Sequence, residues 1–147
     1  KLRRALIHAA RRGERVGQLV QGRHENFMQF HASRPVLGAL LAAGIEIHEY
    51  SVSFLHAKVA VVDGYWATVG SSNLDPLSLL LAREANVVVE DRAFATELRT
   101  CLTNAMQTQG TLLNAQALAN RPLRQRVLDH IAYAGMRLLL FLSGRRY

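Results

Sequence analysis

Residues 55–73 read LHAKVAVVDGYWATVGSSN, and this stretch decides which fold the whole chain is expected to adopt. Two runs rich in β-branched residues, 56–62 and 65–69, are separated by Asp63 and Gly64. An Asp-Gly pair is favoured in a type I′ turn because both central residues of that turn have positive φ. The stretch therefore predicts an antiparallel β-hairpin.

Helical and strand-like patterns alternate on both sides of the hairpin. A break is expected at Pro35, since proline disrupts the interior of a helix. The hairpin is antiparallel, whereas the helix-strand units suggest crossover connections, so the predicted fold is α/β with a mixed β-sheet flanked by helices. The predicted helices are 2–12, 36–43 and 92–106, the last capped by Asp91, and the further strands are 15–21, 45–50 and 85–90.

The chain is expected to divide into three segments: a folded domain at 1–107, a polar linker at 108–121 and a basic amphipathic helix at 122–147. The stretch 138–142 of that helix is strongly apolar, but it is interrupted by Arg137 and is too short to cross a bilayer comfortably. Two roles stay open for the helix: it lies on a membrane surface, or it packs back on the domain.

The composition is that of a folded, basic protein. Half of the residues are hydrophobic, which excludes long disorder, and the single cysteine, Cys101, excludes an internal disulfide. The sequence shows no Cys/His grouping with zinc spacing. A net charge of +7 favours a phosphate-bearing partner, which could be nucleic acid, an anionic membrane surface or a phosphorylated small molecule.

The hairpin also contains the residues whose side chains are best suited to catalysis. His56 and Lys58 are two residues apart, so an extended backbone directs both side chains to one face. Asp63 is an odd number of residues from His56, so it should lie on the other face or in the turn and support the site. The second strand leads to Ser71 and Asn73 at the same end as His56. A histidine nucleophile, a lysine charge and an amide donor are suited to displacement at a phosphodiester.

These residues form the pattern H-x-K-x4-D-x6-G-S-x-N, which resembles the signature of the phospholipase D superfamily. With the stretch EANV at 84–87, it looks very like bacterial cardiolipin synthases, and the resemblance implies a phospholipase D-like half domain at 1–107. It further implies a role for each site residue. His56 would be the nucleophile that forms a phosphohistidine, or the acid that protonates the leaving alcohol. Lys58 and Asn73 would bind the phosphoryl group with help from Ser71, Glu84 would accept a hydrogen bond from the catalytic histidine, and Asp63 would be structural.

The resemblance also implies a reaction, its partners and a place in the cell. The reaction is phosphatidyl transfer to a phosphatidylglycerol hydroxyl, which forms cardiolipin without a metal or other cofactor. The partners would be phosphatidylglycerol and a membrane surface, with the protein peripheral on the cytoplasmic face of the bacterial inner membrane. The second lipid, phosphatidylglycerol or phosphatidylethanolamine, stays open.

Members of this family build one site from two such motifs, and this chain has one. We therefore expect a fragment that corresponds to the carboxyl-terminal half, with the second motif in the same full-length chain or in a dimer mate. Two alternatives remain: a homodimeric phosphodiesterase or nuclease of the same superfamily, and an incomplete phosphate-binding module. The apolar stretch 138–142 favours lipid over nucleic acid. Trp66 and the other histidines are expected to be packing or surface residues: His8, His24, His31, His48 and His130.

Overall fold

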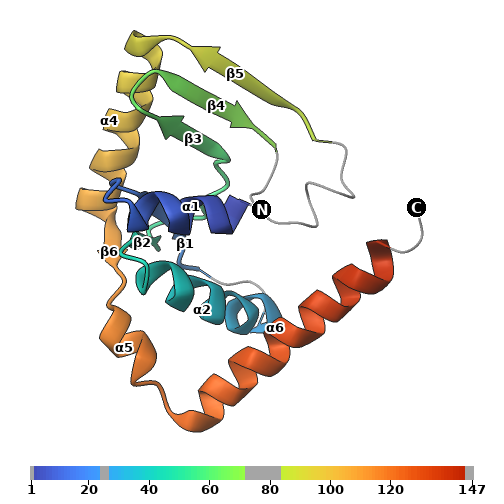
Figure 1. Cartoon of the computed structure of the whole chain (residues 1–147). Coiled ribbons are helices and arrows are strands. Elements are labelled where there is room, and N and C mark those ends of the chain that lie inside the picture. Colours follow the sequence, from blue (N-terminus) through green and yellow to red (C-terminus); the bar gives the residue numbers. More distant parts are fainter. Residues whose placement is uncertain (1, 24–26, 72–83, 145–147) are drawn as a thin grey trace.

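The computed structural model describes residues 2–23, 27–71 and 84–144 and has an α/β architecture, which confirms the predicted fold class (Figure 1). Its strands form two three-stranded sheets, in the orders β1-β2-β6 and β3-β4-β5. The elements in chain order are α1 (Leu2–Arg11), β1 (Gly17–Gln21), α2 (Phe27–Leu41), β2 (Glu46–Tyr50), β3 (Val59–Val62), β4 (Trp66–Gly70), β5 (Asn86–Glu90), α4 (Arg92–Gln109), β6 (Gly110–Leu112), α5 (Ala115–Ala119) and α6 (Leu123–Gly144).

The first sheet contains the mixed pairing. β1 is parallel to β2, and β2 is antiparallel to β6. The main buried cluster lies between this sheet and α2, and because its residues are apolar, burying them drives the packing of the two. The cluster consists of Leu37, Leu40, Ile45 and Ile47.

The structure places the short strand β6 and the helix α5 within the segment 108–121, which was expected to be a polar linker. The strand depends on a close approach at Gly110. A Cβ atom there would lie 2.7 Å from the carbonyl oxygen of Met106 and 2.9 Å from the Cβ of His48. The pairing therefore needs glycine at this position, and a strand of only three residues leaves little pattern in the sequence.

The prediction of a break at Pro35 is wrong. α2 begins at Phe27 and contains Pro35 in its interior. Proline costs a helix one backbone hydrogen bond. Here the flanking turns are fixed by buried side chains, because Arg34 forms an ion pair with Glu49 of β2 and His31 bonds to Asp129 of α6. Tertiary contacts thus hold a helix that the local pattern does not favour.

The second sheet contains the predicted hairpin. Val59 is paired with Val69, and Trp66 with Glu90, in two antiparallel ladders. Asp63 and Gly64 have φ values of 54° and 61°, so both turn residues have the positive φ that the Asp-Gly pair predicts. Trp66 is half-buried within the sheet, as expected of a packing residue.

α4 connects the two sheets. Its amino terminus is capped as predicted, because the Asp91 carboxylate accepts a hydrogen bond from the backbone N–H of Phe94 at 2.8 Å. Ala95 of α4 and Ala67 of β4 are fully buried. The helix contacts strands of both sheets and runs along one side of the molecule (Figure 1).

α6 packs against α2 along its first half and extends past it (Figure 1). α6 lies within the segment 122–147, which was expected to form a helix. Within residues 2–23, 27–71 and 84–144, no helix combines the length and the apolar character that a bilayer span requires.

Candidate active site

Three segments of the chain meet at one end of the β3-β4-β5 sheet, opposite the hairpin turn (Figure 1). The backbone N–H of Gly70 donates to the carbonyl of Lys58 at 3.0 Å, which joins the end of β4 to the residue before β3. The N–H of Ser71 donates to the carbonyl of Ala85 at 3.0 Å, which joins β4 to the segment before β5. The predicted site residues Lys58, Ser71 and Glu84 therefore belong to adjoining segments.

His56 and Lys58 lie before β3 and not inside it, so the prediction that the strand begins at His56 is wrong. The β3-β4 ladder ends with the bond between Lys58 and Gly70, because β4 itself ends at Gly70. His56 is exposed and Lys58 is half-buried. An exposed histidine two residues from a half-buried lysine provides a reactive nitrogen and a positive charge at the open end of the sheet.

Ser71 has a hydrogen-bonding role that its sequence context did not indicate. The backbone N–H of Ala85 donates to the Ser71 hydroxyl oxygen at 3.0 Å, in addition to the backbone bond between the same two residues. The side chain of Ser71 therefore fastens β4 to the chain before β5. Glu84, which is half-buried, lies directly beside this junction in the sequence.

The structure separates one predicted residue from this group and leaves another outside the described residues. Asp63 lies in the turn at the far end of the hairpin, exposed. It lies five residues from Lys58 along the chain, which corresponds to about 16 Å when the chain is extended. Asn73 belongs to residues 72–83, outside the described residues.

The open end of the sheet is held by a glycine, which gives a first testable prediction. A Cβ atom at Gly70 would lie 2.5 Å from the carbonyl oxygen of Ala85 and would collide with the side chain of Asn86. We expect Gly70→Ala to lower the free energy of unfolding by about 1–3 kcal/mol, measured by urea denaturation. Gly135→Ala is the matched control, since nothing lies within 4 Å of its Cβ position and alanine favours the helix. Equal stability of Gly70→Ala and the parent would contradict this role.

Two residues near the end of β1 support the segment that leads to His56, and neither was predicted from the sequence. The backbone N–H of Leu55 donates to the side-chain oxygen of Gln21 at 2.9 Å. Arg23 donates from Nε to the carbonyl of Ser51 at 2.8 Å. The first pair is separated by 34 residues in the chain, so no local pattern could have shown it. These bonds attach the loop before His56 to the first sheet.

The arrangement suits chemistry at an anionic ester. The exposed imidazole of His56 can attack phosphorus or transfer a proton, while the ammonium group of Lys58 can neutralise charge on the non-bridging oxygens. In the part of the chain that the structure describes, no three His, Cys, Asp or Glu side chains are grouped so that they could hold a metal ion.

Comparison with known proteins identifies the family. Residues 1–106 match the family model described as the cardiolipin synthase, PLD-like domain. The chain is 47% identical over 95 residues to cardiolipin synthase B of Escherichia coli strain K12, covering 65% of this chain and 23% of that protein. It is 36% identical over 129 residues to cardiolipin synthase A of Pectobacterium carotovorum, covering 88% of this chain and 26% of that protein. The chain thus spans about a quarter of the length of these relatives.

A solved structure shows the same fold. The crystal structure of a phospholipase D family member, Nuc from Salmonella typhimurium, superposes with a TM-score of 0.65 at 21% identity, covering 77% of this chain and 73% of that chain. The family match extends from α1 over most of α4 and ends before β6 of the first sheet, and it includes every predicted site residue. This chain is therefore a member of the cardiolipin synthase, PLD-like domain family.

Proposed function

We propose that this chain supplies one half of an active site that transfers a phosphatidyl group between two phospholipids and forms cardiolipin. The observation that carries the proposal is the meeting of the His56, Ser71 and Glu84 segments at one sheet end in a member of the cardiolipin synthase domain family. Phosphatidylglycerol would be both donor and acceptor, and the protein would work at the surface of the bacterial inner membrane, on its cytoplasmic face.

The proposed reaction has two displacements. A ring nitrogen of His56 attacks the phosphorus of one phosphatidylglycerol, the bond from phosphorus to the glycerol oxygen breaks, and the released glycerol oxygen takes a proton from the acid of the second half. A hydroxyl of a second phosphatidylglycerol then attacks the phosphohistidine, loses its proton to that same group and frees His56. Lys58 and Asn73 would hold the phosphoryl oxygens in both steps, and Glu84 would orient the imidazole.

A second half is needed because this motif provides the nucleophile but not the group that donates and then accepts the proton. Uncovered apolar surface beside the site supports such a partner. β5 is an edge strand of its sheet, and Val87, directly opposite Val69, is 64% exposed. Exposed apolar side chains on an edge strand are favourable sites for association with another protein surface. The partner would be the other motif-bearing half, in the same full-length chain or in a dimer mate.

Labelled phosphatidylglycerol in detergent micelles tests the proposal. The chain would be incubated alone and together with the part of Escherichia coli cardiolipin synthase B that precedes the region it matches. We expect labelled cardiolipin and free glycerol from the pair, and at least about 10²-fold less from the chain alone, since proton transfer contributes that much or more to the rate. Absence of cardiolipin from a folded, associated pair would contradict the proposal, and hydrolysis of DNA by that pair would favour the phosphodiesterase alternative.

A further inference from the structure

Along its first half, α6 has two unlike faces, and only one of them packs on the domain; beyond that half, Leu139, Phe141 and Leu142 are exposed. Asp129 is buried against α2, at 4% exposure. On the opposite face, Leu123, Ile131 and Leu138 are 74%, 63% and 58% exposed. At 100° per residue, the apolar side chains of this face fall within an arc of about 100°, with Asp129 on the far side. This outer stripe consists of Leu123, Val127, Ile131, Ala134 and Leu138.

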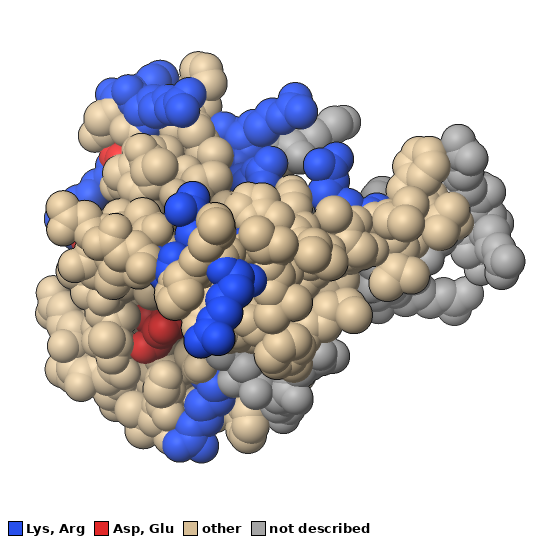
Figure 2. All heavy atoms as spheres, turned by 90° about the horizontal axis from the view of Figure 1, so that it is seen from below, with Lys and Arg blue, Asp and Glu red and all other residues tan. Residues whose placement is uncertain are grey.

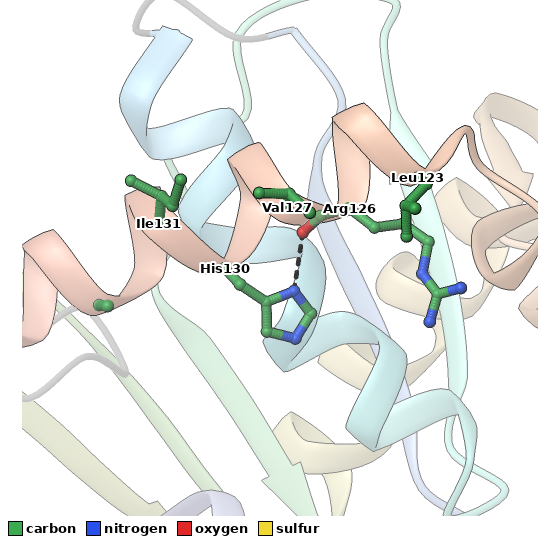
Figure 3. Close-up of a pocket in the computed structure, with 6 residues that line it drawn as sticks. Leu123, Arg126, Val127, His130 and Ile131 are labelled. Carbon is green, nitrogen blue, oxygen red and sulfur yellow. Dashed lines mark hydrogen bonds between the residues drawn. The ribbon is translucent and has the colours of Figure 1, made fainter.

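The stripe is a shallow hollow on the helix and not a closed cavity. Leu123, Val127 and Ile131 follow one another along α6, while His130 folds back to its own helix (Figure 3). Its Nδ1 bonds to the carbonyl of Arg126 at 2.8 Å. Of the two polar side chains that line the hollow, His130 is thus engaged within the helix, and the other is Arg126; the remaining lining is hydrocarbon.

The charges that flank the stripe have one sign. Arg126 and Arg137 lie along one border and Arg124 along the other, from the helical spacing. Among the described residues of α6, the single acidic one is Asp129, which is buried and bonded to Arg121 at 2.7 Å. Figure 2 views the molecule from below, where α6 lies, and shows basic side chains in separate patches with few acidic ones visible.

We propose that the outer stripe of α6 docks on the surface of an anionic phospholipid bilayer, with the helix axis in the plane of the interface. The inference deepens the proposed function and rests on it for the choice of a lipid surface. An apolar arc flanked by arginines matches an interface whose headgroups are negative and whose interior is hydrocarbon. A second copy of the chain fits less well, since pairing two such helices brings arginines together at both borders.

Docking by this face would also set the orientation of the domain. The inner face of α6 is fixed to α2 through His31 and Asp129, so the helix cannot rotate independently of the domain. A bilayer on the outer face would therefore hold the whole domain in one orientation. This is a different surface from the open end of the β3-β4-β5 sheet, so its occupation leaves the proposed site accessible.

Flotation with vesicles tests the proposal on the whole chain. Vesicles of phosphatidylglycerol and phosphatidylcholine would be compared with vesicles of phosphatidylcholine alone. We expect the double variant Leu123→Gln, Ile131→Gln to bind the anionic vesicles at least about tenfold more weakly. The two apolar side chains would be buried in the bilayer on docking, and glutamine loses that stabilisation. The double variant Arg126→Gln, Arg137→Gln should lose about fivefold per arginine on anionic vesicles only.

The matched control is the double variant Val62→Gln, Leu112→Gln, which removes two exposed apolar side chains from the sheets. It should float like the parent, and circular dichroism should show equal helix content in all variants. His56→Ala should also float like the parent, so that failure of the transfer reaction leaves the docking result readable. Binding by the Leu123, Ile131 variant equal to that of the parent would overturn the proposal. The proposal would also be overturned if the parent chain did not float with anionic vesicles. A third contradicting result would be that substitutions in the outer stripe only convert a dimer of this chain to a monomer.

Discussion

Replacing His56 with alanine is expected to lower kcat for cardiolipin formation by the two-half enzyme by at least about 10³-fold. The imidazole is exposed at the open end of the β3-β4-β5 sheet, so its removal takes away the reactive nitrogen and leaves the backbone in place. KM should change little, because Lys58 and Asn73, the residues proposed to bind the phosphoryl group, remain. Initial rates with labelled phosphatidylglycerol, measured over a range of lipid concentrations, separate the two constants.

His8→Ala is the matched control for this measurement. His8 is likewise exposed, and its ring contacts Arg12 of its own helix. We expect it to retain the parent rate and the parent melting temperature. If His56→Ala, folded and paired with the second half, turned over like His8→Ala, then His56 would have no part in the reaction.

Trapping distinguishes the two roles open to His56. If it is the nucleophile, the covalent intermediate is a phosphohistidine, in which phosphorus is bonded to a ring nitrogen of His56. Brief incubation with phosphatidylglycerol labelled in its phosphate should therefore leave an acid-labile label on this chain. If it is the acid, the label should appear on the partner half. Label on neither half in a pair that forms cardiolipin would exclude the covalent mechanism.

The hairpin could be predicted from the sequence because everything that specifies it is local. Two β-branched runs and an Asp-Gly pair lie within 14 residues, and the φ values of Asp63 and Gly64 agree with that pattern. The cap of α4 by Asp91 is local in the same sense. The prediction of His56 and Lys58 as site residues also used only local information, namely their types and spacing beside this hairpin.

The elements that were missed or predicted wrongly depend on contacts between distant parts of the chain. α2 continues through Pro35 because side chains of β2 and α6 hold its neighbours, and β6 forms because Gly110 fits against His48. Contacts between distant parts of the chain also determine the geometry of the candidate site. The bond between Ser71 and Ala85 follows from the register of β4 and β5, and Gln21 reaches Leu55 from the other sheet. No spacing within one segment carries that information.

His31 and Asp129 are the strongest case of such a distant contact, and Asp129→Ala should destabilise the fold at least as much as Gly70→Ala. The two residues are 98 positions apart in the chain, and Oδ1 of Asp129 accepts a hydrogen bond from Nδ1 of His31 at 2.5 Å. The other carboxylate oxygen accepts from Nη1 of Arg121 at 2.7 Å. Removing the carboxylate leaves a buried imidazole and a largely buried guanidinium group without this partner. We expect the free energy of unfolding to fall by about 3 kcal/mol, measured by urea denaturation.

Ile131→Gln is the control on the same helix. Its side chain lies on the outer stripe, two residues from Asp129, so the free energy of unfolding should change by no more than about 0.5 kcal/mol. Asp129→Asn should fall between the two, since an amide oxygen can still accept from His31 while the negative charge is lost. This order separates the contribution of the buried carboxylate from any general sensitivity of α6.

A double-mutant cycle identifies the partner that matters. If the bond to His31 fixes α6, then the double variant His31→Ala, Asp129→Ala should lose less free energy of unfolding than the two single variants lose in sum. The difference, which is the coupling energy, should be about 0.5–3 kcal/mol. Strict additivity, or an Asp129→Ala variant as stable as Ile131→Gln, would contradict the role given to this pair. Since the same bond keeps the outer stripe turned away from the domain, a weakened Asp129 variant should also show faster proteolysis within α6, whereas Ile131→Gln should not.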